Sequence, residues 1–112
     1  MAWLVRDGEV LASLEVAATR KARRKGLLGR DGIDGALLLR PARSVHTLGM
    51  RFDIDVAFLD RDGVVRRAVR MRRHRVGWPC WSARSVVEAE AGAFARWSLS
   101  VGQRLEVVEV RE

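Results

Sequence analysis

The chain has 112 residues, of which 48% are hydrophobic and 31% charged, a size and composition typical of one soluble globular domain over residues 1–112. No apolar run reaches the about 20 residues that a membrane-spanning helix needs. Asp7 and Glu9 interrupt the stretch where a signal peptide would be apolar, so a cytoplasmic location is expected. Cys80 is the only cysteine, which excludes an internal disulfide and a thiolate metal cluster within one chain.

The formal net charge of +7 is concentrated in one part of the chain. Residues 61–80 contain seven basic groups and one acidic group, and 19 of the 21 basic residues in the whole chain are arginine. Codon usage in a GC-rich genome is one explanation for so many arginines. A local excess of positive charge is also typical of proteins that bind an acidic partner such as nucleic acid, and both interpretations stay open.

The first elements in chain order are a hairpin, a helix and a strand. Asp7-Gly8 lies between two short apolar runs, which indicates a two-residue turn with positive φ. The segment TRKARRKGLLGRDG predicts a short helix that Thr19 caps and that Gly29 or Gly32 ends. Five basic residues crowd its first turns, where the helix dipole favours acidic groups, so helix stability does not explain them. GALLLRP predicts a strand that ends at Pro41.

An alternating strand follows in the segment FDIDVAFLD. One face carries Phe52, Ile54, Val56 and Phe58, and the other carries Asp53, Asp55, Ala57 and Leu59. The tight turn over residues 60–63 leads into a return strand over residues 64–71, and an irregular loop then contains Gly77 and Pro79. Further strands are predicted at residues 85–92 and 102–110, and the short stretch between them fits one helical turn.

These elements predict the fold class. Runs of strands joined by hairpins, without repeats or linkers, are typical of a sheet protein with little helix. We therefore expect an α+β fold with a mainly antiparallel, curled or barrel-like sheet of six to seven strands and one short helix packed on it.

Several segments, read in order, resemble one known family. They are RRKGLLGR, an apolar strand, HTLGMRFDIDVAFLDRDGVV, VVEAEAG and VGQRLEV. Together they look like Domain of Unknown Function 192, a family of small prokaryotic proteins, over about residues 17–108. The order and spacing of the segments carry the resemblance, which no single segment does alone.

The resemblance implies a set of equivalent positions. Family motifs fall on Arg23, Gly26, Leu27 and Arg30, on Asp55, Val56, Ala57 and Phe58, and on Val87, Glu88, Ala91 and Gly92. Many members carry Trp-Met-Lys-Asn-Thr where this chain has HTLGM, and proline where it has Asp53, so roles of that version do not transfer. The family has no established activity, and the resemblance therefore implies a fold and an alignment but no mechanism.

The predicted helix carries Arg23, Leu27 and Arg30 along one stripe. If Leu27 is part of the core, arginines on this stripe need a carboxylate, for which Asp55 and Glu88 are the candidates. One interpretation is an ion-pair clamp that docks the helix on the sheet. The other is a pocket between helix and sheet for a small polar or anionic ligand, or an accessory domain. The ligand-binding candidates are Arg23, Arg30, His46, Thr47, Asp55 and Glu88.

A catalytic alternative uses the same segments. His46 with Asp55 and Glu88 would make a metal-assisted or acid–base centre. No spacing in the chain is diagnostic for a metal or a cofactor, so neither is predicted. Whether the protein is an enzyme and which oligomeric state it adopts stay open.

A second alternative is weak nucleic-acid binding through residues 61–75. Arg66, Arg70 and Arg72 share one strand face, and Trp78 in the next loop could stack on a base. The chain contains no known nucleic-acid motif, and arginines on an exposed strand also prevent edge-to-edge aggregation. Cys80, which lies between Trp78 and Trp81, is interpreted as apolar packing rather than as a nucleophile.

Overall fold

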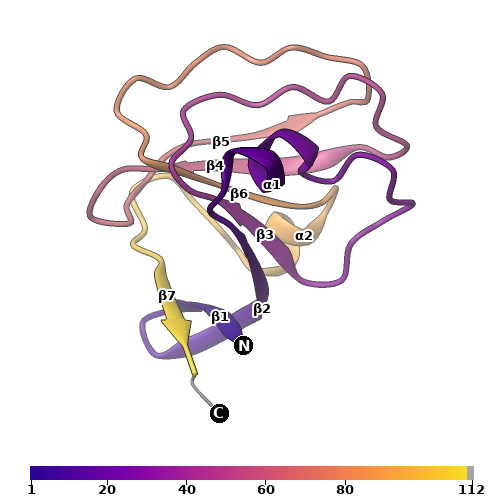
Figure 1. Ribbon diagram of the computed structural model, residues 1–112. Helices are drawn as coiled ribbons and strands as arrows, with labels where there is room; N and C mark the ends of the chain where they lie inside the picture. The colour runs from indigo at the N-terminus through magenta and orange to yellow at the C-terminus, as the bar shows by residue number, and fades with distance from the viewer. Residues whose placement is uncertain (111–112) are drawn as a thin grey trace.

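Seven strands and two short helices make up residues 1–110, the part of the chain that the computed structural model describes (Figure 1). The elements are β1 (Ala2–Arg6), β2 (Glu9–Ala17), α1 (Arg20–Lys25), β3 (Ala36–Leu39), β4 (Ile54–Leu59), β5 (Val65–Met71), β6 (Ser85–Glu90), α2 (Ala93–Arg96) and β7 (Glu106–Glu109). The strands form one sheet in the order β5-β4-β6-β3-β2-β1-β7. The β2–β3 pair is parallel and the other described pairs are antiparallel, so the sheet is mixed.

The sheet is strongly curved but open, with β5 and β7 at its two ends. An isolated bridge between Val64 and Arg104, and a 2.8 Å hydrogen bond from Leu105 N to Gly63 O, draw the turn before β5 against the segment before β7. The predicted number of strands is confirmed, whereas no closed barrel forms over residues 1–110. The sheet carries two short helices instead of the one counted in the expected fold, because the single helical turn expected between the last two strands forms α2.

Local sequence decides where several elements begin and end. Asp7 and Gly8 have φ values of +50° and +79°, which suit the type I′ turn predicted between β1 and β2. Thr19 caps α1 as expected, because its Oγ1 accepts a hydrogen bond from Ala22 N at 3.0 Å. The helix ends at Gly26, earlier than predicted, where φ is +47° and only glycine is accommodated readily.

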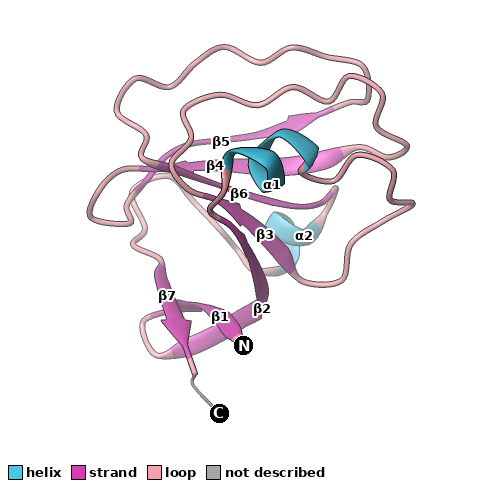
Figure 2. Ribbon diagram, viewed as in Figure 1, coloured by secondary structure: helices cyan, strands magenta, loops and turns pink. Residues whose placement is uncertain are grey.

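The central strand β4 is buried along its whole length. Ile54, Val56 and Phe58 pack in the cluster on the side of α1, while Ala57 and Leu59 pack in the cluster on the side of α2. The alternation predicted for this segment is therefore confirmed. Because each face needs its own cover, α1 and α2 lie on opposite faces of the sheet (Figure 2).

Two long loops lie side by side next to α1, one after β3 and the other after β5 (Figure 1). Backbone hydrogen bonds from Gly77 N to Val45 O at 3.0 Å and from Cys80 N to Arg43 O at 2.7 Å join them. This pairing holds residues 43–47 in place over the sheet. Within the described residues, neither helix has the length or the apolar character to span a membrane.

Candidate ligand-binding cavity

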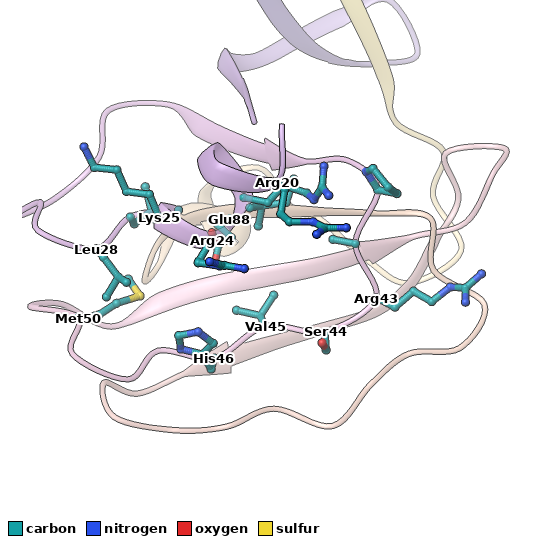
Figure 3. A pocket seen from close by; sticks show the side chains of 16 residues that line it. Arg20, Arg24, Lys25, Leu28, Arg43, Ser44, Val45, His46, Met50 and Glu88 are labelled. Carbon is teal, nitrogen blue, oxygen red and sulfur yellow. The ribbon is translucent and has the colours of Figure 1, made fainter. Parts of the chain in front are cut away.

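A hollow of about 350 Å³ opens between α1, the loop after β3 and the sheet (Figure 3). Residues of α1 and of the turn after it form one wall, residues 41–46 form the opposite wall, and Glu88 of β6 lies between them. Leu27, Leu39 and Val45 contribute apolar lining. The volume suits a small molecule, since ligand pockets usually measure about 300–1,000 Å³.

Gly26 brings the backbone after α1 against Glu88. Its φ is +47° and its ψ is −126°. In this region of backbone conformation any residue with a Cβ is strained, whereas glycine is not. A Cβ at this position would lie 3.7 Å from Oε1 of Glu88, so the chain passes the carboxyl group at van der Waals distance. The same turn buries Leu27, which is 2% exposed. The Gly26-Leu27 pair thus forms both a wall of the cavity and an anchor in the core.

Glu88 is a buried carboxyl group, only 3% exposed, and within residues 1–110 it has no side-chain hydrogen bond or ion pair. Its oxygens retain contact with the hollow, because every fully enclosed side-chain oxygen or nitrogen that the structure describes has a hydrogen-bond partner. Loss of hydration on burial raises the pKa of Glu88 to about 7. Near neutral pH the group therefore exists in both its acid and its ionised form.

Five basic side chains surround the cavity, and we refer to them as the cationic rim: Arg20, Arg23, Arg24, Lys25 and Arg43. Figure 3 shows Arg20 and Arg24 on the side of α1, while the side chains of Lys25 and Arg43 extend outward from the edge of the hollow. Nε of Arg43 donates a hydrogen bond to Ala83 O at 3.2 Å. In the described part of the chain, no rim residue makes an ion pair with a carboxylate. The basic groups around the cavity are therefore not neutralised by ion pairs with carboxylates of the described residues.

His46 lies on the cavity wall that faces α1 (Figure 3). Its backbone pairs with Val76 in an isolated bridge, and its side chain is exposed. Across residues 1–110, no three histidine, cysteine, aspartate or glutamate side chains are grouped as a metal ion would require. His46 and Glu88 thus share one cavity without a third ligand.

Asp55 lies on the other face of the sheet and does not reach the cavity. Its Oδ1 accepts a hydrogen bond from Arg70 Nε at 3.1 Å, and its Oδ2 accepts bonds from the backbone N–H groups of Gly92 and Phe94 at 3.0 and 3.1 Å. The expectation that a helix arginine pairs with Asp55 was wrong, because Arg70 of β5 takes that place. The predicted centre of His46, Asp55 and Glu88 is therefore not assembled.

Two other ligand candidates also lie outside the cavity lining. Arg30 makes an exposed ion pair with Glu15 of β2, with 2.7 Å between Nη1 and Oε2. Thr47 is fully buried, and its hydroxyl donates to Arg72 O at 2.6 Å and accepts from Arg75 N at 2.9 Å. Thr47 therefore fastens the two long loops together. Of the six sequence-based candidates, the structure brings Arg23, His46 and Glu88 to the cavity.

The residues considered for nucleic-acid binding lie on β5, the strand at one end of the sheet, and in the loop that follows it. Arg70, Arg72 and Trp78 line a second hollow of about 480 Å³ beside β5, and Arg66 lies outside its lining. Trp78 is 83% exposed. Arg70 is partly neutralised by its contact with Asp55, which leaves less free charge on this face than the sequence indicates.

A protein-family model named DUF192 and described as "Uncharacterized ACR" matches residues 2–107. The chain belongs to the DUF192 family. The match covers nearly the whole chain, so the resemblance drawn from the sequence segments is confirmed.

Two solved structures share the fold seen here. A protein of unknown function from Novosphingobium aromaticivorans is 17% identical, with a TM-score of 0.77 over 94% of this chain and 82% of that chain. A protein from Sinorhizobium meliloti, described as a "putative transcription regulator", is 23% identical, with a TM-score of 0.79 over 95% of this chain and 91% of that chain. At these identities the likeness concerns the fold alone. A search of the curated proteins gave no match.

The structure gives a physical role to three of the four positions of the first DUF192 motif, namely Arg23, Gly26 and Leu27. The guanidinium of Arg23 donates to Ala18 O at 2.7 Å and to Arg40 O at 3.3 Å, which ties the start of α1 to the end of β3. Gly26 makes the sharp turn, and Leu27 enters the core. The motif therefore builds one wall of the cavity.

Sequence reasoning missed Arg20, Arg24, Lys25 and Arg43 as cavity residues. The signal for the first three was present, since basic residues at the start of a helix oppose its dipole and needed another explanation. Nothing in the sequence pointed to Arg43, because the pairing of the two long loops brings it to the cavity.

We predict that Asp55→Ala lowers the free energy of unfolding by about 3 kcal/mol, because it leaves the N–H groups of Gly92 and Phe94 without an acceptor. Asp31→Ala is the control, since the Asp31–Arg51 pair is largely exposed and contributes at most about 1 kcal/mol. Urea unfolding monitored by tryptophan fluorescence measures both changes. Equal losses in the two variants would contradict the anchoring role of Asp55.

A second prediction concerns Glu88→Gln and pH. The pKa of Glu88 is 4.5 in its unperturbed form and about 7 when folded, so the folded state holds the proton more tightly. The protonated form therefore favours folding, and this advantage disappears as pH rises from about 5 through 7. Relative to the Gln variant, the wild-type protein should lose about 3 kcal/mol between pH 5 and pH 8.

Thermal and urea unfolding of both proteins across this pH range measures the difference, in which the other titrating groups cancel. A stability difference that does not change with pH would show that Glu88 titrates normally.

Proposed function

We propose that this protein binds a small anionic molecule in the cavity between α1 and the sheet. The observation that carries the proposal is that one hollow contains both basic side chains and the buried carboxyl group of Glu88, and that none of these groups makes an ion pair within residues 1–110. The cationic rim supplies attraction for the anion, and arginine forks suit carboxylate and sulfate or phosphate oxygens. The apolar lining from Leu27, Leu39 and Val45 supports a ligand that also carries a small apolar part.

Glu88 gives the cavity a proton donor. In its acid form the carboxyl group donates a hydrogen bond to a ligand oxygen, whereas the ionised form repels an anion. An anion next to Glu88 therefore favours the protonated form, and binding takes up a proton when the pH is above the pKa. The raised pKa of Glu88, about 7, allows this exchange near neutral pH.

We predict that anion affinity falls by about tenfold between pH 6 and pH 8, because the binding-competent protonated form of Glu88 becomes scarce. Sulfate and tartrate are suitable test anions, since both keep their own charge over this range. Isothermal titration calorimetry at constant ionic strength gives the dissociation constants. In Glu88→Gln the amide keeps an N–H donor at every pH, so its affinity should stay nearly constant.

Arginine variants locate the binding surface. Arg24→Ala removes a rim residue, while Arg61→Ala removes the same charge from an exposed position outside the cavity lining. We expect Arg24→Ala to weaken anion binding about tenfold, as loss of a charge-assisted hydrogen bond does, and Arg61→Ala to leave it nearly unchanged. Equal effects of the two variants, or no saturable binding of either anion, would contradict the proposal.

A further inference from the structure

The outer edge of β5 is open. β5 is the last strand on one side of the sheet and pairs with β4 on its inner side. Val65 also bonds to the segment before β7, through Val65 N to Gln103 O and Gly102 N to Val65 O, both at 2.8 Å. For residues 66–71 the structure describes no backbone hydrogen bond other than those to β4. A row of backbone donors and acceptors is therefore available to another extended chain.

The second hollow, of about 480 Å³, runs beside this edge, and we refer to it as the edge groove. Val69 and Met71 of β5 line one side, and Val76 and Trp78 of the following loop line the other. Val69, Val76 and Trp78 are 38%, 72% and 83% exposed. Such a set of exposed apolar side chains in one groove is typical of a contact surface.

The far wall of the edge groove is held in place by its neighbours. The guanidinium of Arg67 lies 4.4 Å from the ring centroid of Phe58 and donates a hydrogen bond to the carbonyl oxygen of Trp78. Gly77 N bonds to Val45 O at 3.0 Å. The backbone of Trp78 is thus fixed while its indole stays exposed, so a partner need not order this segment when it binds.

The two faces of β5 differ in a way that defines the partner. By register, Val69 and Met71 point to the side of the edge groove, and so does Arg67, whose guanidinium is engaged by Phe58 and the carbonyl of Trp78. Arg70 points to the side of Asp55, although it also contributes to the groove lining, as do Arg72 and Arg75 at the end of the strand. Side chains of an added strand would alternate between the same two faces. Apolar residues on one face of the added strand would then meet Val69, Met71 and Trp78. Acidic residues on its other face would meet Arg70, and an acidic residue at its end would meet Arg72 and Arg75.

We propose that the edge groove and the open edge of β5 bind an extended acidic segment of a partner protein, with acidic and apolar residues in alternation. Main-chain hydrogen bonds to β5 supply affinity, and the groove and the arginines supply specificity. This site is separate from the anion cavity. It uses Val69, Val76 and Trp78, none of which lines that cavity.

Charge excludes a second copy of this chain as the occupant. Two β5 strands side by side would bring Arg66, Arg67, Arg70 and Arg72 of both copies together, and like charges across strands are destabilising. Protection of the edge from self-association would explain the arginines. It would not explain why an exposed tryptophan lies beside them. Single-stranded nucleic acid matches the arginines and Trp78, but it cannot pair with alternating backbone donors and acceptors.

The test uses a short fluorescein-labelled peptide in which glutamate and valine alternate. Its controls are a peptide with lysine in place of glutamate, a peptide of the same composition with the glutamates in one block, and a labelled oligothymidylate. Fluorescence anisotropy should show saturable binding of the alternating acidic peptide, at least tenfold tighter than either control peptide. Absent binding at millimolar concentration, equal binding of the blocked peptide, or binding of the oligothymidylate alone would overturn the proposal.

Two further comparisons separate strand pairing from charge attraction. Every second amide of an added strand faces β5, and the amides between them face away. Two peptides are therefore compared, one with its odd-numbered and one with its even-numbered amides N-methylated. One of them should no longer bind, and the affinity of the other should stay within about twofold of the unmethylated peptide. Trp78→Ala should weaken binding on the order of tenfold. Trp81→Ala should not, since Trp81 is also largely exposed but lies outside the groove lining. Indifference to both changes would show that the peptide does not lie on this edge.

Discussion

The register between β4 and β6 determines how this protein uses its two buried carboxyl groups. Asp55 lies opposite Ala89, and Val56 lies opposite Glu88. Because neighbouring residues in a strand point to opposite faces, Asp55 faces α2 and Glu88 faces α1. A shift of one residue would exchange the two faces, so the anchor of α2 and the cavity under α1 depend on the same pairing.

The two carboxyl groups have opposite surroundings. Asp55 accepts three hydrogen bonds, one of them from a guanidinium, and it fastens α2 and β5 to the central strand. Glu88 has no side-chain hydrogen bond within residues 1–110, and burial raises its pKa to about 7. A buried group that costs stability in its ionised form and opens into a cavity is typical of functional sites rather than of structural ones.

The two long loops connect both proposed sites to the sheet. The bridge between His46 and Val76 places a cavity residue opposite a groove residue, and Thr47 fastens the second loop through its hydroxyl group. Residues far apart in the chain thereby form two separate surfaces, a cationic cavity next to α1 and, next to β5, a groove lined by apolar side chains and arginines. Nine of the 21 basic residues line one or the other of these surfaces, and Asp55 neutralises part of the charge of Arg70.

The sequence by itself determined the local structure, namely the Asp7-Gly8 hairpin, the Thr19 cap, the alternation from Phe52 to Leu59 and the family. These features depend on residues a few positions apart, whose φ preferences and strand period act locally. Only the tertiary structure decided that Asp55 pairs with Arg70, that Glu88 meets the cationic rim, and that Thr47 is a structural residue. Those outcomes depend on strand register and loop pairing between segments that are distant in the chain, which local patterns do not encode.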